Sequence, residues 1–340
     1  MPDRAHQITI FLRGTKWANA DRRTVAGDAS NRRYERLTLG DGTTSILMDA
    51  PPDKGEDMRP FVRITNWLRD ASLSAPEIYA QDAEHGFLLI EDLGNDLFAR
   101  VIKADPTLER PLYEAASDVL VNLHRAAPPT LAPYDAKMMT DLAALAFVWY
   151  QRGACGEKDE AAKIAFESAF LAALTPLDTR MDVLIQRDYH AENLIWLPDR
   201  QGVARVGLLD YQDAMLGHRA YDLVSVLQDA RRDVSPDIVH AMTARYITAT
   251  GVDADQFAAD FALLGLQRNM RILGVFARLS LGAGKPHYVD LIPRVWDHIQ
   301  TNLTHPALHP IVPLINGPLP APTPEILQRL KDKCATIPLP

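Results

Sequence analysis

The chain has little cysteine, and it contains neither a long apolar run nor a long basic run. Only Cys155 and Cys334 occur among its 340 residues. Two thiols so far apart cannot build a metal cluster alone and are typical of free thiols in a reducing compartment. No stretch approaches the ~20 apolar residues that a membrane helix requires, and the N-terminus lacks the apolar segment of a secretory signal. These absences favour a cytoplasmic location and no membrane partner.

The charge balance narrows the range of partners. The formal net charge is −8, which argues against nucleic acid or an anionic membrane as the main partner. Nothing in the sequence indicates an obligate protein partner. An apolar fraction of 47% is ample for a packed core, and the length indicates one large domain or two closely packed lobes.

Three polar residues interrupt the most apolar part of the sequence. Asp188 and Asn193 lie five residues apart after the run Val183 to Ile185, and Asp210 follows another apolar run. Such runs are typical of buried strands. A buried carboxylate without a partner is costly, and a divalent cation is one way to compensate it.

This arrangement matches the chemistry of phosphoryl transfer. A carboxylate and an amide oxygen suit Mg²⁺, which completes its coordination with substrate phosphates. Asn193 and Asp210 are therefore the expected Mg²⁺ ligands, with ATP as the phosphate donor. Asp188 is the expected catalytic base, which aligns a substrate hydroxyl and accepts its proton. For any one of these residues alone, an ordinary loop or turn role would be the better interpretation.

The order of predicted elements indicates an α+β protein with two lobes. Residues 1–90 alternate short strands with one or two helices and form a β-rich N-terminal nucleotide-binding lobe. Residues 91–95 are the expected hinge, and residues 96–304 form a larger, mainly helical lobe that carries the catalytic and substrate residues. Residues 305–340 are a Pro-rich tail, expected to be extended over the large lobe. This is the bilobal architecture of the protein-kinase-like fold, and a ligand is expected in the cleft between the lobes.

The expected nucleotide contacts lie in the small lobe and the hinge. The segment Gly27–Asn31 lies between two predicted strands, where small residues allow backbone N–H groups to approach phosphates. By itself it is an ordinary hairpin turn, but its position in the small lobe favours a nucleotide loop. The expected contacts are Gly27, Asp28, Ser30, Asn31, Arg32, Glu91 and Leu93.

Several other polar residues have two interpretations. His190 and His218 are predicted to be polar loop residues, with a substrate contact by His190 as the alternative. Asp213 either faces the substrate or caps the following segment. Arg268 and Asn269 begin an apolar helical run, where they either bind substrate hydroxyls or form a solvated, ion-paired face.

Asp222 also has two interpretations. It begins a predicted helix shortly after Asp210, and it is expected to be a buried carboxylate that orders the catalytic loop by hydrogen bonding. A direct role as a metal ligand is the alternative.

Together these motifs resemble the aminoglycoside phosphotransferase (choline kinase-like) superfamily. The resemblance rests on the segments Asp188–Asn193, Leu209–Ala214 and Tyr221–Leu223, and it extends over most of the chain. The segments Gly27–Tyr34, Leu47–Pro52, Phe61–Ile64 and Gln267–Asn269 are more similar to bacterial anomeric sugar kinases. That resemblance implies phosphorylation of N-acetylmuramate and N-acetylglucosamine at C1 in peptidoglycan recycling.

The chain departs from the usual kinase pattern at two positions. Gln186 occupies the position two residues before Asp188 where many kinases have histidine. The strand Ile46–Asp49 lacks the usual phosphate-binding lysine. Lys54, Arg32, Arg33 and Arg63 are the candidates to replace its charge.

Other functions remain open at this level. A kinase for an aminoglycoside or a choline-like acceptor is the nearest alternative, and a nucleotide-binding pseudokinase is a more distant one. The interval between Asp210 and Asp222 is too short for an activation segment, which argues against a protein kinase.

Overall fold

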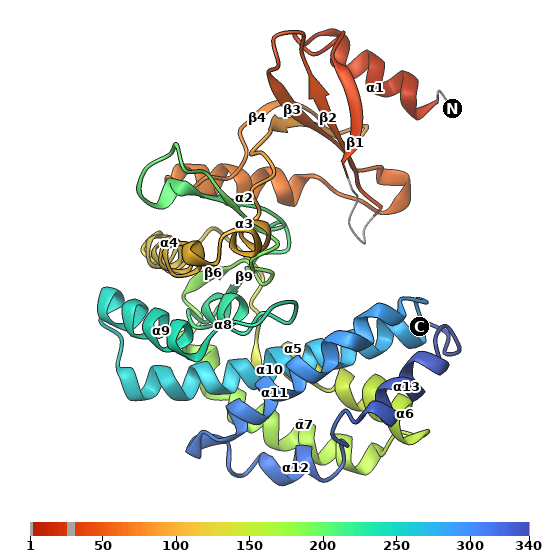
Figure 1. Ribbon diagram of the computed structural model, residues 1–340, viewed down its shortest axis with the longest axis vertical. Helices are drawn as coiled ribbons and strands as arrows, with labels where there is room; N and C mark the ends of the chain where they lie inside the picture. Colours follow the sequence, from red (N-terminus) through yellow and green to blue (C-terminus); the bar gives the residue numbers. More distant parts are fainter. Residues whose placement is uncertain (1–2, 26–30, 340) are drawn as a thin grey trace. The chain divides into compact units, whose positions relative to one another are not determined.

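The structure, a computed structural model, describes residues 3–25 and 31–339 (Figure 1). Its contacts divide the chain into two compact units. Unit 1 comprises Met1–Leu123 and Glu192–Ala214, and unit 2 comprises His124–Ala191 and Met215–Pro340. Unit 1 carries a five-stranded antiparallel sheet, whereas unit 2 is mainly helical, which confirms the α+β class. This division uses other boundaries than the expected lobes, so the hinge at residues 91–95 stays a prediction.

Unit 1 is built around its sheet, whose strand order is β1-β2-β3-β5-β4. The strands are β1 (Asp21–Val25), β2 (Arg33–Thr38), β3 (Thr44–Asp49), β4 (Ile78–Asp82) and β5 (Phe87–Glu91). The α-helices are α1 (Arg4–Arg13), α2 (Arg59–Asp70), α3 (Phe98–Ala104) and α4 (Glu109–Leu123), and the short 3₁₀ turns are η1 (Pro52–Lys54), η2 (Pro106–Leu108) and η5 (Gly202–Arg205).

The alternation of side chains gives the sheet two different faces. On one face, Leu37, Leu47 and Leu89 pack against Ile8 and Leu12 of α1. On the other face, three residues form a row across the strands, because Arg36 of β2 pairs with Ile46 of β3 and Ile46 pairs with Ile90 of β5. The first face is therefore covered by a core, and the second is available for a site.

The later part of unit 1 is a short hairpin. Strands β7 (Leu194–Trp196) and β8 (Val206–Leu208) pair antiparallel, with Leu194 opposite Leu208. The pairing continues beyond the strands, because the backbone N–H of Leu209 donates to the carbonyl of Asn193 at 3.0 Å. The residues that flank this hairpin, Asn193 and Asp210, are consequently brought to the same end of it.

Unit 2 is organised by one long helix, α10 (Ala254–Leu281), which packs against its neighbours α5, α8 and α11 (Figure 1). Gly274 allows the close approach of the chain at Leu145, because a Cβ at Gly274 would lie 2.3 Å from the Leu145 carbonyl carbon. The other helices are α5 (Ala136–Ala143), the π-helical η3 (Ala146–Gln151), α6 (Arg152–Cys155), α7 (Glu160–Leu174), η4 (Thr175–Arg180), α8 (Tyr221–Leu227), α9 (Pro236–Thr250), η6 (Pro286–Leu291), α11 (Ile292–Leu303), η7 (Pro306–Leu308), α12 (Val312–Asn316) and α13 (Pro324–Asp332). Two short strands, β6 (Val183–Ile185) and β9 (Met215–Gly217), pair antiparallel.

The Pro-rich tail differs from the expected extended segment. It contains η7, α12 and α13, and a proline lies in the first turn of each. Proline fits that position because the first helical N–H groups have no intrahelical acceptor. Prolines in this tail therefore start helices.

Within residues 3–25 and 31–339, no helix is long and apolar enough to cross a membrane.

Candidate functional site

The segment Gln186–Arg187 leads from β6 to Asp188 and is held by Asp222. Asp222 lies in the first turn of α8 and is fully buried. Its carboxylate accepts hydrogen bonds from the backbone N–H groups of Gln186, at 2.6 Å, and Arg187, at 2.9 Å. These bonds confirm the expectation that Asp222 is a buried carboxylate that orders this segment by hydrogen bonding. Burial raises the pKa of Asp222 to about 6, although both hydrogen bonds act to lower it.

Arg187 adopts a backbone conformation that is uncommon for a residue with a side chain. Its φ is 71°, in the left-handed region. The same residue donates its N–H to Asp222 and accepts a hydrogen bond at its carbonyl from Nη1 of Arg268, at 2.6 Å. Both sides of its peptide are thus held, which compensates for the local strain. The result is a fixed backbone immediately before Asp188.

Asp188 lies among cationic side chains of unit 2. Burial is the largest single influence and acts to raise the pKa of the carboxyl, but the surrounding charges, Arg268 and Arg271 foremost, together keep that pKa below its usual range. His190 and Arg187 act in the same direction. Asp188 is therefore ionised at neutral pH, and it can accept a hydrogen bond from a hydroxyl but is a weak base.

In unit 1, Asn193 and Asp210 meet at the end of the β7–β8 hairpin. Nδ2 of Asn193 lies 3.5 Å from Oδ2 of Asp210, and Nε2 of Gln212 donates to Oδ1 of Asp210 at 2.7 Å. Tyr211, which follows Asp210 in the chain, is buried, and its Oη forms a hydrogen bond with Oγ1 of Thr65 at 2.6 Å. Asp210 is consequently fixed by its neighbours on the chain and by α2.

Asn193 and Asp210 suit a hard cation that takes only one or two of its ligands from the protein. In the described part of the chain, no group of three or more His, Cys, Asp and Glu side chains is arranged to hold a metal ion. Asn193 and Asp210 offer an amide and a carboxylate at close range. Mg²⁺ commonly takes one or two protein ligands and completes its shell with water and phosphate.

A cavity of about 310 Å³ lies within unit 1. One wall is the free face of the sheet, with Tyr34, Ile46 and Ile90, and another contains Leu208 and Leu209. Glu91 and Leu93 line it, as do Asn193 and Asp210. The structure thus brings two of the expected nucleotide contacts together with both expected metal ligands.

The other expected nucleotide contacts do not all lie in the described structure. Gly27, Asp28 and Ser30 are outside the described residues. Arg32 is paired with Glu56, with Nε 2.8 Å from Oε2, and the backbone N–H of Asn31 donates to the same carboxylate at 3.0 Å. Asn31 and Arg32 therefore belong to one local network with Glu56.

Arg36 is a cation in this cavity that the sequence prediction missed. Arg33, Lys54 and Arg63, which were candidates to replace the strand lysine, are exposed, whereas Arg36 lines the cavity. Its Nη2 donates to Asp92 Oδ1 and to Asn95 Oδ1, each at 2.9 Å. Side chains alternate along β2, which puts Arg36 on the same face as Tyr34. This alternation is the sequence pattern that could have identified Arg36 as a candidate.

The expected substrate contacts lie in different surroundings. His190 is buried, its pKa is lowered by burial to about 4, and its Nε2 lies 3.4 Å from Nη1 of Arg231. Asp213 is exposed in unit 1. Asn269 is fully buried, and its Nδ2 donates to Gln228 Oε1 at 2.7 Å and to the Gly265 carbonyl at 2.8 Å. That environment favours a structural role for Asn269, while Arg268 holds the loop before Asp188.

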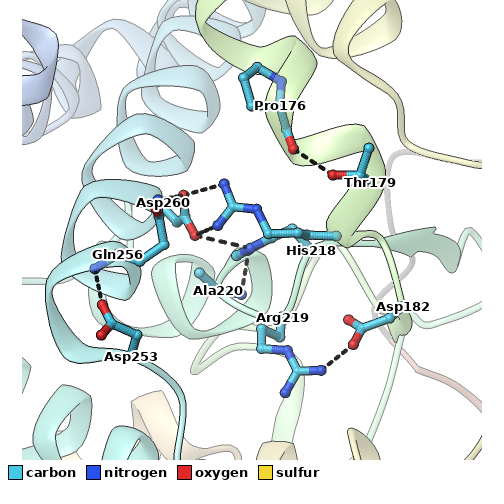
Figure 2. A network of polar contacts seen from close by, with 10 residues as sticks. Pro176, Thr179, Asp182, His218, Arg219, Ala220, Asp253, Gln256 and Asp260 are labelled. Atoms are coloured by element: carbon cyan, nitrogen blue, oxygen red, sulfur yellow. Dashed lines mark hydrogen bonds and ion pairs between the residues drawn. The ribbon is translucent and has the colours of Figure 1, made fainter.

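His218 belongs to a second polar network at the start of α10, drawn in Figure 2. The buried carboxylate of Asp260 pairs with Arg180, and its Oδ2 lies 3.3 Å from Nε2 of His218. Nδ1 of His218 accepts a hydrogen bond from the backbone N–H of Ala220 at 3.2 Å. The network therefore ties η4 and the segment after β9 to the helix that carries Arg268.

The chain is similar to known phosphotransferases and kinases. Residues 21–258 match the phosphotransferase enzyme family. The N-acetylmuramate/N-acetylglucosamine kinase of Caulobacter vibrioides is 40% identical over 88% of this chain and 92% of its own length. The protein of the same name from Pseudomonas aeruginosa is 33% identical over 82% of each chain.

A solved structure supports the fold independently. The ADP-bound aminoglycoside phosphotransferase APH(2'')-Ib matches with a TM-score of 0.59 at 13% identity, over 87% of this chain and 97% of that one. At this identity the likeness concerns the fold, which is thereby confirmed as kinase-like. From the family match and the two kinase relatives together, this chain belongs to the phosphotransferase enzyme family and is a kinase.

Proposed function

We propose that the chain is an ATP- and Mg²⁺-dependent kinase that phosphorylates the anomeric (C1) hydroxyl of N-acetylmuramate and N-acetylglucosamine. The observation that carries the substrate class is the 40% identity to an N-acetylmuramate/N-acetylglucosamine kinase over nearly all of both chains. Such an activity would return amino sugars released from peptidoglycan to metabolism.

The nucleotide is proposed to bind in the cavity of unit 1. Its apolar walls suit a base, and Glu91 and Leu93 lie at its edge. Asn193 and Asp210 would hold Mg²⁺, which would neutralise charge on the transferred phosphoryl group. Gly27, Asp28, Ser30, Asn31 and Arg32 remain the proposed phosphate contacts.

Asp188 is proposed to orient the acceptor hydroxyl. It accepts the hydroxyl proton as the oxygen–phosphorus bond to the sugar forms and the bond between the β- and γ-phosphates breaks. An anomeric hydroxyl is more acidic than an ordinary alcohol, so a weak base such as this carboxylate is sufficient. Phosphoryl transfer depends mainly on positioning and charge neutralisation, and the bonds that hold Gln186 and Arg187 supply part of that positioning.

The charges near Asp188 discriminate between acceptors. An aminoglycoside or a choline-like acceptor is a cation, and Arg268 and Arg271 both act on Asp188. Like charges at close range disfavour such a ligand. A neutral or anionic amino sugar meets no such penalty, which makes it the better candidate.

A substrate panel tests the proposal directly. Purified protein is incubated with ATP, Mg²⁺ and, in separate reactions, N-acetylglucosamine, N-acetylmuramate, choline and an aminoglycoside, and the products are identified by ³¹P NMR. We expect sugar phosphates coupled to the anomeric proton. Phosphate found only on other hydroxyls, or only on the cationic acceptors, would refute the assignment.

A further inference from the structure

Helix α10 presents two arginines, one turn apart, toward the residues around Asp188. Residues three apart lie on the same side of a helix. Arg268 reaches the carbonyl of Arg187, the residue before Asp188, and Arg271 Nη1 lies 3.4 Å from Oη of Tyr221, the residue before Asp222. Their surroundings differ, however. Arg268 is buried and its Nη1 donates to the carbonyl of Arg187, so its guanidinium already has a structural partner.

Arg271 has spare hydrogen-bonding capacity. It is half-buried, and its one hydrogen bond within the described residues is a long one, from Nη1 to Tyr221 Oη at 3.4 Å. A guanidinium has five N–H donors in a rigid planar fork. Most of those donors thus have no hydrogen-bond partner among the described residues.

The charges in this cluster are not balanced. Three guanidinium groups, those of Arg187, Arg268 and Arg271, act on Asp188, and the second carboxylate nearby is Asp222. Three positive charges face two negative ones, which leaves an excess of one positive charge. The effect extends to Tyr221: burial acts most strongly to raise the pKa of the phenol, but Arg271, Arg268 and other neighbours together lower it.

We propose that Arg271 binds the carboxylate of an acidic amino sugar, and so distinguishes N-acetylmuramate from N-acetylglucosamine. This inference rests on the proposed function and adds a specificity residue to it. The two sugars differ by the lactyl ether of N-acetylmuramate, which carries the only charge on either molecule. An arginine fork matches a carboxylate with two parallel hydrogen bonds, and the bound anion cancels the excess charge.

The test compares both sugars on three proteins. Values of kcat/KM are measured for wild type, Arg271→Gln and the matched control Arg268→Gln. We expect Arg271→Gln to lower the ratio of N-acetylmuramate to N-acetylglucosamine by about 10- to 100-fold, the usual effect of losing a hydrogen bond to a charged group. Arg268→Gln is expected to impair both sugars in parallel, because it acts through the loop before Asp188.

A second measurement on the wild-type protein covers the case in which the variants do not fold. N-acetylmuramate is compared with its methyl ester, in which the charge is masked, and we expect the ester to be the poorer substrate by about 10-fold or more. Equal rates for acid and ester, or a parallel decline of both sugars in Arg271→Gln, would overturn the subsite while leaving the kinase assignment intact. Wild type inactive on both sugars would instead overturn the proposed function, and the subsite with it.

Discussion

The carboxylate of Asp222 and the backbone of Arg187 are joined by a hydrogen bond of 2.9 Å, and Arg187 has a φ of 71°. Thirty-five residues separate the two in the chain. The bond secures an otherwise unfavourable backbone conformation directly before Asp188. A fully buried residue is thereby linked to the geometry of the proposed catalytic base.

Replacement of Asp222 by asparagine should therefore impair catalysis more than folding. The amide side chain would present one acceptor oxygen and an NH₂ group in place of two acceptors, so one of the backbone N–H groups loses its partner. Hydrogen bonds to charged groups contribute about 1.5–3 kcal/mol, so we expect kcat to fall about 10- to 100-fold. Steady-state kinetics and circular dichroism measure the two effects, with exposed Asp297→Asn as the control. Unchanged kcat in a folded Asp222→Asn protein would contradict this role.

The acid side of the pH profile offers a second test of Asp222. Its pKa is raised to about 6, so it gains a proton as the pH falls through 6 and becomes a poorer acceptor for two N–H groups. We expect kcat of the wild type to decline across this range. The decline should be weaker in Asp222→Asn, because that side chain does not titrate, and an identical acid limb in both proteins would argue against the link.

If Asp188 is the catalytic base, its replacement should reduce turnover without weakening nucleotide binding. Asp188→Asn removes the proton acceptor but keeps the shape of the side chain, and general-base catalysis contributes typically ~10²–10⁴-fold. We expect turnover to fall within that range while nucleotide affinity, measured by calorimetry, stays close to that of the wild type. Substantial remaining turnover would show that another group accepts the proton.

The proposed metal ligand predicts a change in the Mg²⁺ requirement. Asp210→Asn removes the only carboxylate of the Asn193–Asp210 pair, so the Mg²⁺ concentration for half-maximal activity should rise by about 100-fold, comparable to the larger effects of disturbing a metal site. Asp199→Asn is the matched control, an exposed carboxylate between β7 and β8. The same Mg²⁺ dependence in Asp210→Asn and wild type would remove Asp210 as a ligand.

Local sequence patterns were sufficient to predict much of the fold and to select the polar residues of the proposed site. The helical periodicity of residues 57–71, for example, matches helix α2 (Arg59–Asp70), which buries Phe61, Ile64 and Leu68. The proposal for Asp188, Asn193 and Asp210 came from polar residues at the ends of apolar runs. The role of Asp222 was predicted because a carboxylate that begins a buried helix requires hydrogen-bond donors.

Features that depend on distant parts of the chain were not predicted. Arg36 meets Asp92 across a separation of 56 residues, and Arg180 meets Asp260 across 80. No local pattern encodes such pairs, because they depend on how strands and helices pack. The expectation of an extended tail was wrong for a different reason: it rested on the proline content alone, although proline is well suited to the first turn of a helix.

The position of Arg36 predicts a selective effect on the nucleotide. Arg36→Gln removes a charge from the cavity and weakens the bonds that tie β2 to Asp92 and Asn95. We expect KM for ATP to rise about 10-fold, in line with the loss of a charge-assisted bond, while KM for the sugar changes little. Arg22→Gln is the control, because Arg22 is paired with Glu35 and lies on the neighbouring strand. Equal changes in both KM values would place Arg36 outside the nucleotide site.

The buried imidazole of His124 predicts how stability depends on pH. Burial, followed by the positive charge of Arg219, lowers the pKa of His124 to about 3, and Nδ1 bonds Tyr246 Oη at 2.6 Å. A depressed pKa in the folded state means that the unfolded chain binds a proton more readily below about pH 6.5. Neutral His124 therefore makes its full contribution to the free energy of unfolding above that pH. This contribution is lost progressively as the pH falls toward 3.

Between pH 7.5 and pH 5.5 this single group should lower the free energy of unfolding by about 1.4 kcal/mol. Urea denaturation at the two pH values measures the difference, which should shrink by that amount in His124→Asn. His240→Asn serves as the matched control, because this histidine is exposed on α9. The prediction concerns the change with pH, so a uniform loss of stability from the broken bond to Tyr246 does not affect it. An equal pH dependence in His124→Asn and wild type would show that His124 does not remain neutral in the folded protein.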